Sequence, residues 1–149
     1  MWYATTRKWI KIEGSYEPIY EISYAQSGDG ISWRREAKQL LRPKSKYEVN
    51  TRPTVIMING YYHMWFCYRD VFDFRPGGNG QYKIGYAYSY DMVNWIRDDS
   101  LAGIGLSDSG WDSEMMAYPY VLSVGSKIYM FYNGNEFGRY GFGYAELCA

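Results

Sequence analysis

The sequence has little histidine and little cysteine, and each shortage excludes a class of functional site. Its 149 residues include one histidine, His63, and two cysteines, Cys67 and Cys148. One histidine excludes a histidine-rich metal site and argues against a Ser-His-Asp triad, so His63, within a strand beside Met64, is interpreted as structural. Two cysteines without metal-type spacing favour reduced thiols over a disulfide framework. We therefore expect no metal and no cofactor.

The sequence also lacks an excess of charge of either sign and any long apolar run. Sixteen basic and sixteen acidic side chains give a formal net charge of zero, which argues against binding to nucleic acid or to a membrane surface. No apolar run approaches the roughly 18 residues of a spanning helix, and the first residues do not resemble a signal peptide. The sequence therefore predicts a cytoplasmic protein that binds neither nucleic acid nor membranes.

Aromatic residues, in contrast, are abundant. Eighteen Tyr, six Trp and six Phe make up 20% of the chain. Such rings pack between sheets while their polar edges stay hydrated, and they are also surfaces on which sugar rings stack. Packing is the commoner use, so aromatic content alone does not identify a carbohydrate-binding protein.

The chain contains an internal repeat. Tyr20–Arg35 and Tyr82–Arg97 align with an offset of 62 residues, and a third, shorter copy, Tyr140–Leu147, follows 58 residues later. A repeat of this length that consists of short strands is typical of propeller blades. The residues shared by the first two copies are, in the numbering of the first, Tyr20, Tyr24, Ala25, Ser27, Asp29 and Trp33.

Short β-rich segments separated by turn signals fill each repeat, and no segment has a helical period. Gly28-Asp29-Gly30 and Asn59-Gly60 predict hairpin turns. Glu13–Pro18 is interpreted as a polar connection and the basic segment Ala37–Lys46 as a crossing between blades. The ten predicted strands are Met1–Ile12, Ile19–Gln26, Ile31–Arg35, Glu48–Ile58, Tyr61–Arg69, Tyr82–Tyr90, Asn94–Asp98, Met115–Val124, Lys127–Tyr132 and Tyr140–Leu147.

The predicted fold class is all-β, a partial β-propeller of about two and a half four-stranded antiparallel blades in a single domain, 1–149. Residues 1–42 form an incomplete blade, 47–99 a complete blade and 114–149 a second incomplete blade. A closed propeller needs at least about four blades, and a half ring would expose large apolar faces. We therefore expect a homo-oligomer, with a dimer favoured, in which two half rings face each other around one funnel.

Six motifs together resemble one family. They are Arg52-Pro-Thr-Val, Tyr62-His-Met-Trp-Phe, Tyr82-Lys-Ile-Gly-Tyr-Ala-Tyr-Ser, Trp95-Ile-Arg-Asp, Ser109-Gly-Trp-Asp-Ser-Glu-Met-Met-Ala-Tyr-Pro and Tyr129-Met-Phe-Tyr-Asn-Gly-Asn. The family is that of the five-bladed β-propeller glycoside hydrolases (families 32, 43, 68, 117 and 130), and the resemblance covers the later half of a full-length member. It implies a central funnel with catalytic carboxylates that project mostly from the innermost strands of the first three blades. The blades expected to carry the general base and its partner are absent from this sequence.

Candidate site residues lie where the first strands of two repeats begin and where the second strands end, because these positions converge on the funnel of a propeller. Residues that differ between repeats are better candidates there than residues that recur, such as Asp29 and Asp91. Asp112 and Glu114, spaced by two, would point to the same side of a strand and are the catalytic candidates, with loop capping as the alternative. The substrate-binding candidates are Glu48, Asn50, Arg52, Arg69, Asp70, Trp111, Tyr118, Asn133 and Asn135.

Three interpretations of function remain open. The first is a glycan-acting enzyme in which Glu114 and Glu48 serve as acid and base across an assembled funnel. The second is a non-catalytic carbohydrate-binding or scaffold module with a saccharide ligand. In it, an Arg69 held by Asp70 would bind a hydroxyl, a carboxylate or a phosphate in forked geometry. The third is a fragment of a longer gene without an independent role.

Overall fold

The computed structural model describes residues 1–36 and 38–148. Ala37, the first residue of the predicted crossing, and Ala149, the last residue of the third predicted blade, lie outside this range. Within it, ten strands form three antiparallel sheets, joined by one 3-10 turn and one four-residue helical turn. The elements are β1 (Trp2–Ile12), β2 (Ser15–Gln26), β3 (Arg34–Glu36), β4 (Glu48–Ile58), β5 (Tyr61–Asp70), β6 (Lys83–Ser89), β7 (Ile96–Arg97), η1 (Asp99–Leu101), β8 (Ala117–Val124), β9 (Lys127–Asn133), α1 (Asn135–Gly138) and β10 (Phe142–Glu146).

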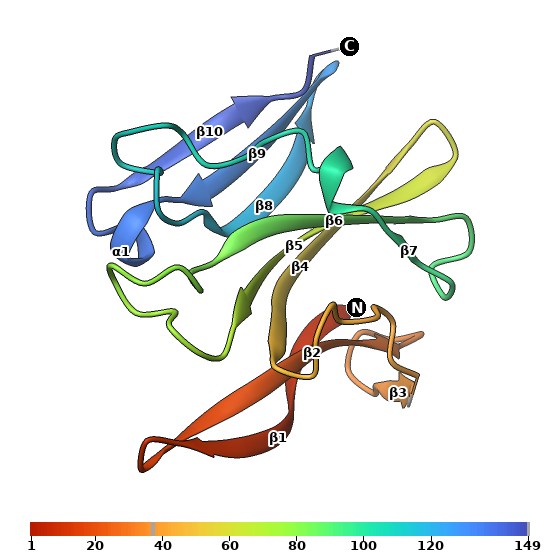
Figure 1. The fold of residues 1–149 in the computed structure, drawn as a ribbon. Coiled ribbons are helices and arrows are strands. Elements are labelled where there is room, and N and C mark those ends of the chain that lie inside the picture. The colour runs from red at the N-terminus through yellow and green to blue at the C-terminus, as the bar shows by residue number, and fades with distance from the viewer. Residues whose placement is uncertain (37, 149) are drawn as a thin grey trace.

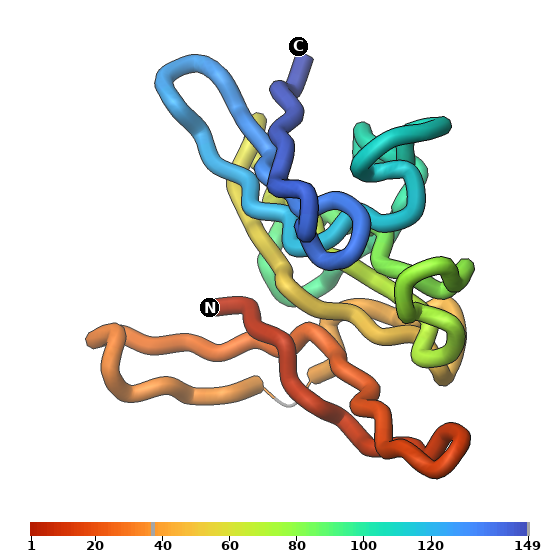
Figure 2. Tube along the Cα trace, turned by 90° about the vertical axis from the view of Figure 1, so that its left-hand side faces the viewer, coloured from red at the N-terminus to blue at the C-terminus, as the bar shows by residue number. Residues whose placement is uncertain are grey.

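The three sheets follow one another as sectors around the inner strands. Their orders are β1-β2-β3, β4-β5-β6-β7 and β10-β9-β8, so a four-stranded sheet lies between two three-stranded ones. Figure 1 and Figure 2 show the first sheet on one side of the central sheet and the third on the other. This arrangement is the partial all-β propeller that the repeat predicts.

The register of the strands reproduces the sequence repeat. Ala25 pairs with Arg35 in the first sheet, and Ala87 pairs with Arg97 in the second, each 62 residues later. The backbone pairing is therefore the same at equivalent positions, which is why the repeated residues recur.

Several details differ from the predicted elements. The predicted connection Glu13–Pro18 is only a two-residue turn, because Glu13 and Gly14 both have positive φ (47° and 90°) and such turns join strands directly into a hairpin. The strand predicted at Ile31–Arg35 is shorter and shifted to Arg34–Glu36, and the strand predicted at Asn94–Asp98 is only Ile96–Arg97. No helix was expected, and two single turns occur, η1 and α1.

The repeated aspartates stabilise the turns between β2 and β3 and between β6 and β7. One carboxylate oxygen of Asp29 accepts hydrogen bonds from the backbone N–H groups of Ile31 and Ser32 at 2.8 Å, and Asp91 does the same for the two equivalent residues. These bonds lower the pKa of both carboxyls, as expected when the charged form accepts several donors.

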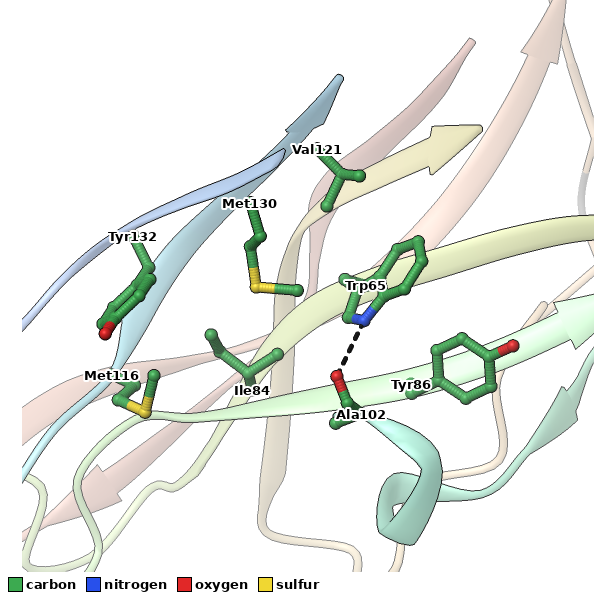
Figure 3. Packing of buried hydrophobic residues seen from close by; sticks show 8 residues of the cluster. All are labelled: Trp65, Ile84, Tyr86, Ala102, Met116, Val121, Met130 and Tyr132. Carbon is green, nitrogen blue, oxygen red and sulfur yellow. Dashed lines mark hydrogen bonds between the residues drawn. The ribbon is translucent and has the colours of Figure 1, made fainter. Parts of the chain in front are cut away.

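Two apolar layers hold the sheets together. Figure 3 shows the layer between the second and third sheets, where the Trp65 indole donates a hydrogen bond to the Ala102 carbonyl at 3.0 Å. The other layer joins the first and second sheets around Ile22, Met64 and Phe66. Burial of such side chains is the main force that orders the sectors.

One hydroxyl links the inner strands β4 and β8 directly. Thr54 Oγ1 accepts a hydrogen bond from the Val121 N–H at 3.1 Å and lies 3.5 Å from the Val121 carbonyl oxygen. The second and third sheets are thereby fixed to each other at their inner edge. In the described part of the chain, no helix is long and apolar enough to cross a membrane.

Candidate saccharide-binding cavity

A cavity of about 670 Å³ lies on the face where the three sheets converge. Its volume is within the range of small-molecule sites. Every sheet contributes to its lining, together with the loop between β5 and β6 and the turn α1. The lining residues are Ala4, Thr6, Trp9, Glu17, Pro18, Tyr20, Thr51, Arg52, Arg69, Phe74, Arg75, Tyr82, Tyr118 and Phe137.

Arg52 and Tyr118 reach the cavity through the same backbone device on the two inner strands. Each lies in a β-bulge, between Thr51 and Thr54 in β4 and between Ala117 and Tyr120 in β8. Both have left-handed backbone (φ 52° and 58°), which is costly for residues with a side chain. The Arg52 guanidinium carbon lies 5.8 Å from the centre of the Tyr118 ring.

Arg69 is the most unusual residue of the cavity, because a charged side chain is only 4% exposed there. Its guanidinium carbon lies 3.6 Å from the Phe74 ring centre and 5.5 Å from that of Tyr82. One terminal nitrogen donates to the Asp70 carbonyl at 2.9 Å. Its Nε is buried and has no hydrogen-bond partner among the described residues. Cation–π contacts therefore hold a guanidinium whose donors are mostly unused.

Six aromatic side chains line the cavity, and three of them, Tyr82, Tyr118 and Phe137, lie close to one another. The Phe137 ring centre lies 6.2 Å from that of Tyr82 and 6.4 Å from that of Tyr118. Burial raises the pKa of Tyr82 to about 12 and also raises the pKa of Tyr118. Both phenols therefore stay protonated near neutral pH and can donate hydrogen bonds to a ligand.

One carboxylate lines the cavity, and it is already paired. Glu17 of β2 accepts a hydrogen bond from Arg75 Nη2 at 3.0 Å. This contact ties the loop between β5 and β6 to the first sheet. The loop between β5 and β6 thus contributes Phe74 and Arg75 to the cavity.

The predicted residues Glu48 and Asn50 lie away from this cavity. Glu48 binds Arg97 and also accepts a hydrogen bond from Asn50 Nδ2 at 3.0 Å. Both line a smaller cavity of about 180 Å³ between β2 and β4. Arg97 in turn contacts Asp99, whose other partner is the Lys44 ammonium at 2.7 Å.

Three predicted residues near the third sheet, Asp112, Trp111 and Asn135, make contacts that stabilise its loops. The Tyr132 hydroxyl donates to Asp112 at 3.0 Å, and the Trp111 ring stacks on Tyr132 with centres 5.4 Å apart. Asn135 Oδ1 accepts from the backbone N–H groups of Glu114 and Met115.

Three further predicted residues, Asn133, Asp70 and Glu114, make hydrogen-bond contacts outside the arginine cluster of the cavity. Asn133 Nδ2 lies 3.4 Å from the Phe137 carbonyl oxygen. Asp70 Oδ1 accepts from the Phe72 N–H at 2.9 Å. The exposed Glu114 carboxylate lies 3.4 Å from Gln81 Nε2 and outside the residues that line the large cavity. The structure thus brings together Arg52, Arg69 and Tyr118 of the predicted site. The catalytic pair of Asp112 and Glu114 stays a prediction.

Several cavity residues were not predicted. Tyr20 and Tyr82 are equivalent positions of the repeat and were interpreted as scaffold, yet both line the cavity. Their place at one end of the repeated third strand was the available signal. Phe137 has positive φ (60°) within α1, and no local sequence signal indicates that turn. No group of three or more His, Cys, Asp or Glu side chains suited to a metal ion occurs among residues 1–36 and 38–148.

Comparisons of sequence place the chain beside proteins without an assigned function. No protein-family model matches it. An uncharacterized protein of Mycobacterium tuberculosis (MT1551) is 35% identical over 148 residues, which cover 99% of this chain and 46% of that protein. This chain therefore spans about half the length of the relatives it matches.

Comparisons of structure identify the fold. A chain described as a glycoside hydrolase has a TM-score of 0.68 at 18% identity, over 99% of this chain and 40% of that one. A thermostable family-43 glycoside hydrolase has a TM-score of 0.67 at 18% identity, over 88% and 45%. Zg3597, a family 117 glycoside hydrolase of Zobellia galactanivorans, has a TM-score of 0.64 at 20% identity, over 86% and 37%. The resemblance indicated by the sequence motifs is confirmed at the level of fold: the chain is a partial β-propeller similar in structure to part of these glycoside hydrolases.

Proposed function

We propose that this chain binds saccharides in the cavity formed by its three sheets. The observation that carries the proposal is the combination of the Tyr82, Tyr118 and Phe137 rings with two arginines, Arg52 and Arg69, in one concavity. Aromatic faces suit the apolar faces of sugar rings, and fixed donors suit their oxygens. The similar structures described as glycoside hydrolases support the proposal.

Binding is favoured over catalysis because of where the carboxylates lie. Glycoside hydrolysis needs two carboxyl groups across the scissile bond, separated by roughly 5–10 Å. In this cavity the lining carboxylate is Glu17, which Arg75 already neutralises. Catalysis by Glu114 and Asp112 remains the second candidate, because Glu114 is an exposed carboxylate at the start of the third sheet.

One experiment separates the two candidates. In a glycan array followed by calorimetry, we expect saturable binding of at least one saccharide and no turnover of aryl glycosides. Tyr118→Ala should weaken that binding about tenfold or more, since stacked rings contribute on the order of 1–3 kcal/mol in related aromatic contacts. Tyr90→Ala, an exposed tyrosine outside the cavity, is the matched control. Turnover that is abolished in Glu114→Gln would favour catalysis instead.

Self-association is a further part of the proposal, because the third sheet exposes an aromatic face. Tyr120, Phe142 and Tyr144 are 61%, 71% and 65% exposed. Phe131 lies opposite both Tyr120 and Tyr144 in the register, so these rings share one face. Apolar patches of this kind mark interaction surfaces. We propose that a second copy of the chain covers it, since the exposed rings of two identical faces can pack against each other.

Light scattering coupled to size exclusion tests this proposal. We expect a dimer at micromolar concentration and a shift toward monomer in Phe142→Ser. Tyr16→Ser, which alters an equally exposed ring on the first sheet, should keep the same mass as the unaltered chain if the third-sheet face makes the contact. A monodisperse monomer of the unaltered chain would contradict the proposal.

A further inference from the structure

The cavity is lined by more basic than acidic side chains. The whole chain has no net charge, yet three arginines and a single carboxylate line the cavity. That carboxylate, Glu17, pairs with Arg75. Among the described residues, Arg52 and Arg69 have no acidic side chain within ion-pair distance. Two positive charges therefore face the cavity without compensation.

Arg69 is buried without the carboxylate partner that a purely structural buried arginine usually has. A guanidinium cannot lose its proton in a protein, so its burial costs free energy unless its charge and its donors are satisfied. Arg97, the other arginine largely withdrawn from solvent, has two carboxylate partners, Glu48 and Asp99. Arg69 has instead two aromatic rings, one carbonyl and an orphaned Nε. The contrast within one sheet indicates that the partner of Arg69 is not part of the chain.

The position of Arg52 supports the same conclusion independently. Its side chain is exposed in the cavity, and its backbone is held in a strained left-handed conformation ahead of Pro53. Opposite it, Tyr118 presents an aromatic face and a phenol that stays protonated near neutral pH. An anionic group on a sugar ring would contact the arginines while the ring lies against the aromatic residues.

We infer that the saccharide bound in this cavity carries an oxyanion, a carboxylate or a sulfate ester, that pairs with Arg69 and Arg52. The inference rests on the proposed function and adds the ligand class. Planar, forked donors of arginine match the two oxygens of a carboxylate and also bind sulfate oxygens. Both ligands are anionic sugars, and probes that carry either a carboxylate or a sulfate ester distinguish the two.

The test is calorimetry of the full chain with charged and neutral forms of the same sugars. The probes are the disaccharides of galacturonate, glucuronate and mannuronate, each beside its methyl ester, and galactose 6-sulfate beside galactose. We expect at least one charged form to bind about tenfold or more tightly than its neutral partner, since hydrogen bonds to charged groups are roughly twice as strong as neutral ones. Added salt should reduce the difference in affinity between the charged and the neutral form.

Variants assign the effect to the arginines. Arg52→Gln should weaken binding of the charged form about tenfold and that of its neutral partner by clearly less, so the preference for the charged form should shrink. Arg69→Lys keeps the charge but loses the fork, so it should reduce the preference partly. Arg34→Gln, an exposed arginine on β3, should change neither. Because Arg52 is exposed, its variant stays informative even where Arg69→Lys fails to fold.

The outcomes separate this inference from the proposed function. Equal binding of charged and neutral forms, unchanged in Arg52→Gln, would overturn the anionic ligand and leave saccharide binding intact. Tighter binding of galactose 6-sulfate or of a uronate would support the inference and identify the anion. Absence of binding by every probe and by the glycan array would overturn both.

Discussion

Replacing Arg97 by leucine is expected to lower the free energy of unfolding by about 3–5 kcal/mol, the usual cost of breaking a buried ion pair. Arg97 is 9% exposed and neutralises Glu48 and Asp99, which are 7% and 10% exposed. Its guanidinium also lies about 5 Å from the ring centres of Phe66 and Tyr68. In the variant, Asp99 would keep the ammonium of Lys44, while Glu48 would lose its ion-pair partner.

The pH dependence of this loss follows from the pKa of Asp99. Burial alone would raise that pKa, but hydrogen bonds from Arg97 and Lys44 outweigh burial and lower it. A lowered pKa in the folded state contributes stability above the ordinary aspartate pKa of about 4, and this stability disappears as the pH falls through the folded value. Once acid has protonated Asp99, that carboxyl no longer needs a cationic partner, so the difference in unfolding free energy between the two proteins should shrink below about pH 4.

Urea denaturation at neutral and acid pH measures both effects. Arg34→Leu is the matched control, because the exposed pair of Arg34 and Glu36 should contribute at most about 1 kcal/mol. A loss in Arg97→Leu no larger than in this control would show that the buried network is not stabilising.

Replacing Phe66 by alanine is expected to cost about 3–5 kcal/mol, the usual cost of removing a buried phenylalanine ring. Phe66 is fully buried in the layer between the first and second sheets. Its ring lies so close to Gly85 that a methyl group placed there would approach ring carbons at 2.6 Å. Gly85 on the neighbouring strand thus leaves room for the Phe66 ring. Alanine at position 66 would leave that space as a cavity.

The same denaturation experiment tests this prediction. Phe72→Ala is the control, since Phe72 is 41% exposed and contacts Tyr47 at the edge of the fold. We expect its loss to be less than half that of Phe66→Ala. Equal losses would mean that the layer between the sheets relaxes to fill the space.

The sequence repeat predicts the backbone well and the cavity only in part. Strand pairing follows from alternating apolar residues and from turn residues, which are local signals, so most strands were placed correctly. The cavity depends on side chains that come from separate elements. Arg69 was recognised at the end of a strand, but its contact with Phe74 requires the path of a loop. Phe137 reaches the cavity through left-handed residues that no pattern indicates.

Glu48 is a residue that the sequence placed in the site and that the structure places elsewhere. It begins an inner strand, as the funnel prediction requires, yet Arg97 lies 49 residues away in sequence and binds it. The pairing depends on the Arg97 side chain reaching from β7 across the Phe66 and Tyr68 rings of β5 to Glu48 in β4, and composition does not determine it.

The bulges that carry Arg52 and Tyr118 affect how the ligand specificity of this cavity could evolve. The conformation of each bulge belongs to the backbone and to the proline that follows, while the projecting side chain differs between the two copies. The fold thus provides two equivalent positions, 52 and 118, from which a side chain projects into the cavity. A different residue at either position would alter which ligands the cavity binds, while the apolar layers between the sheets would stay unchanged.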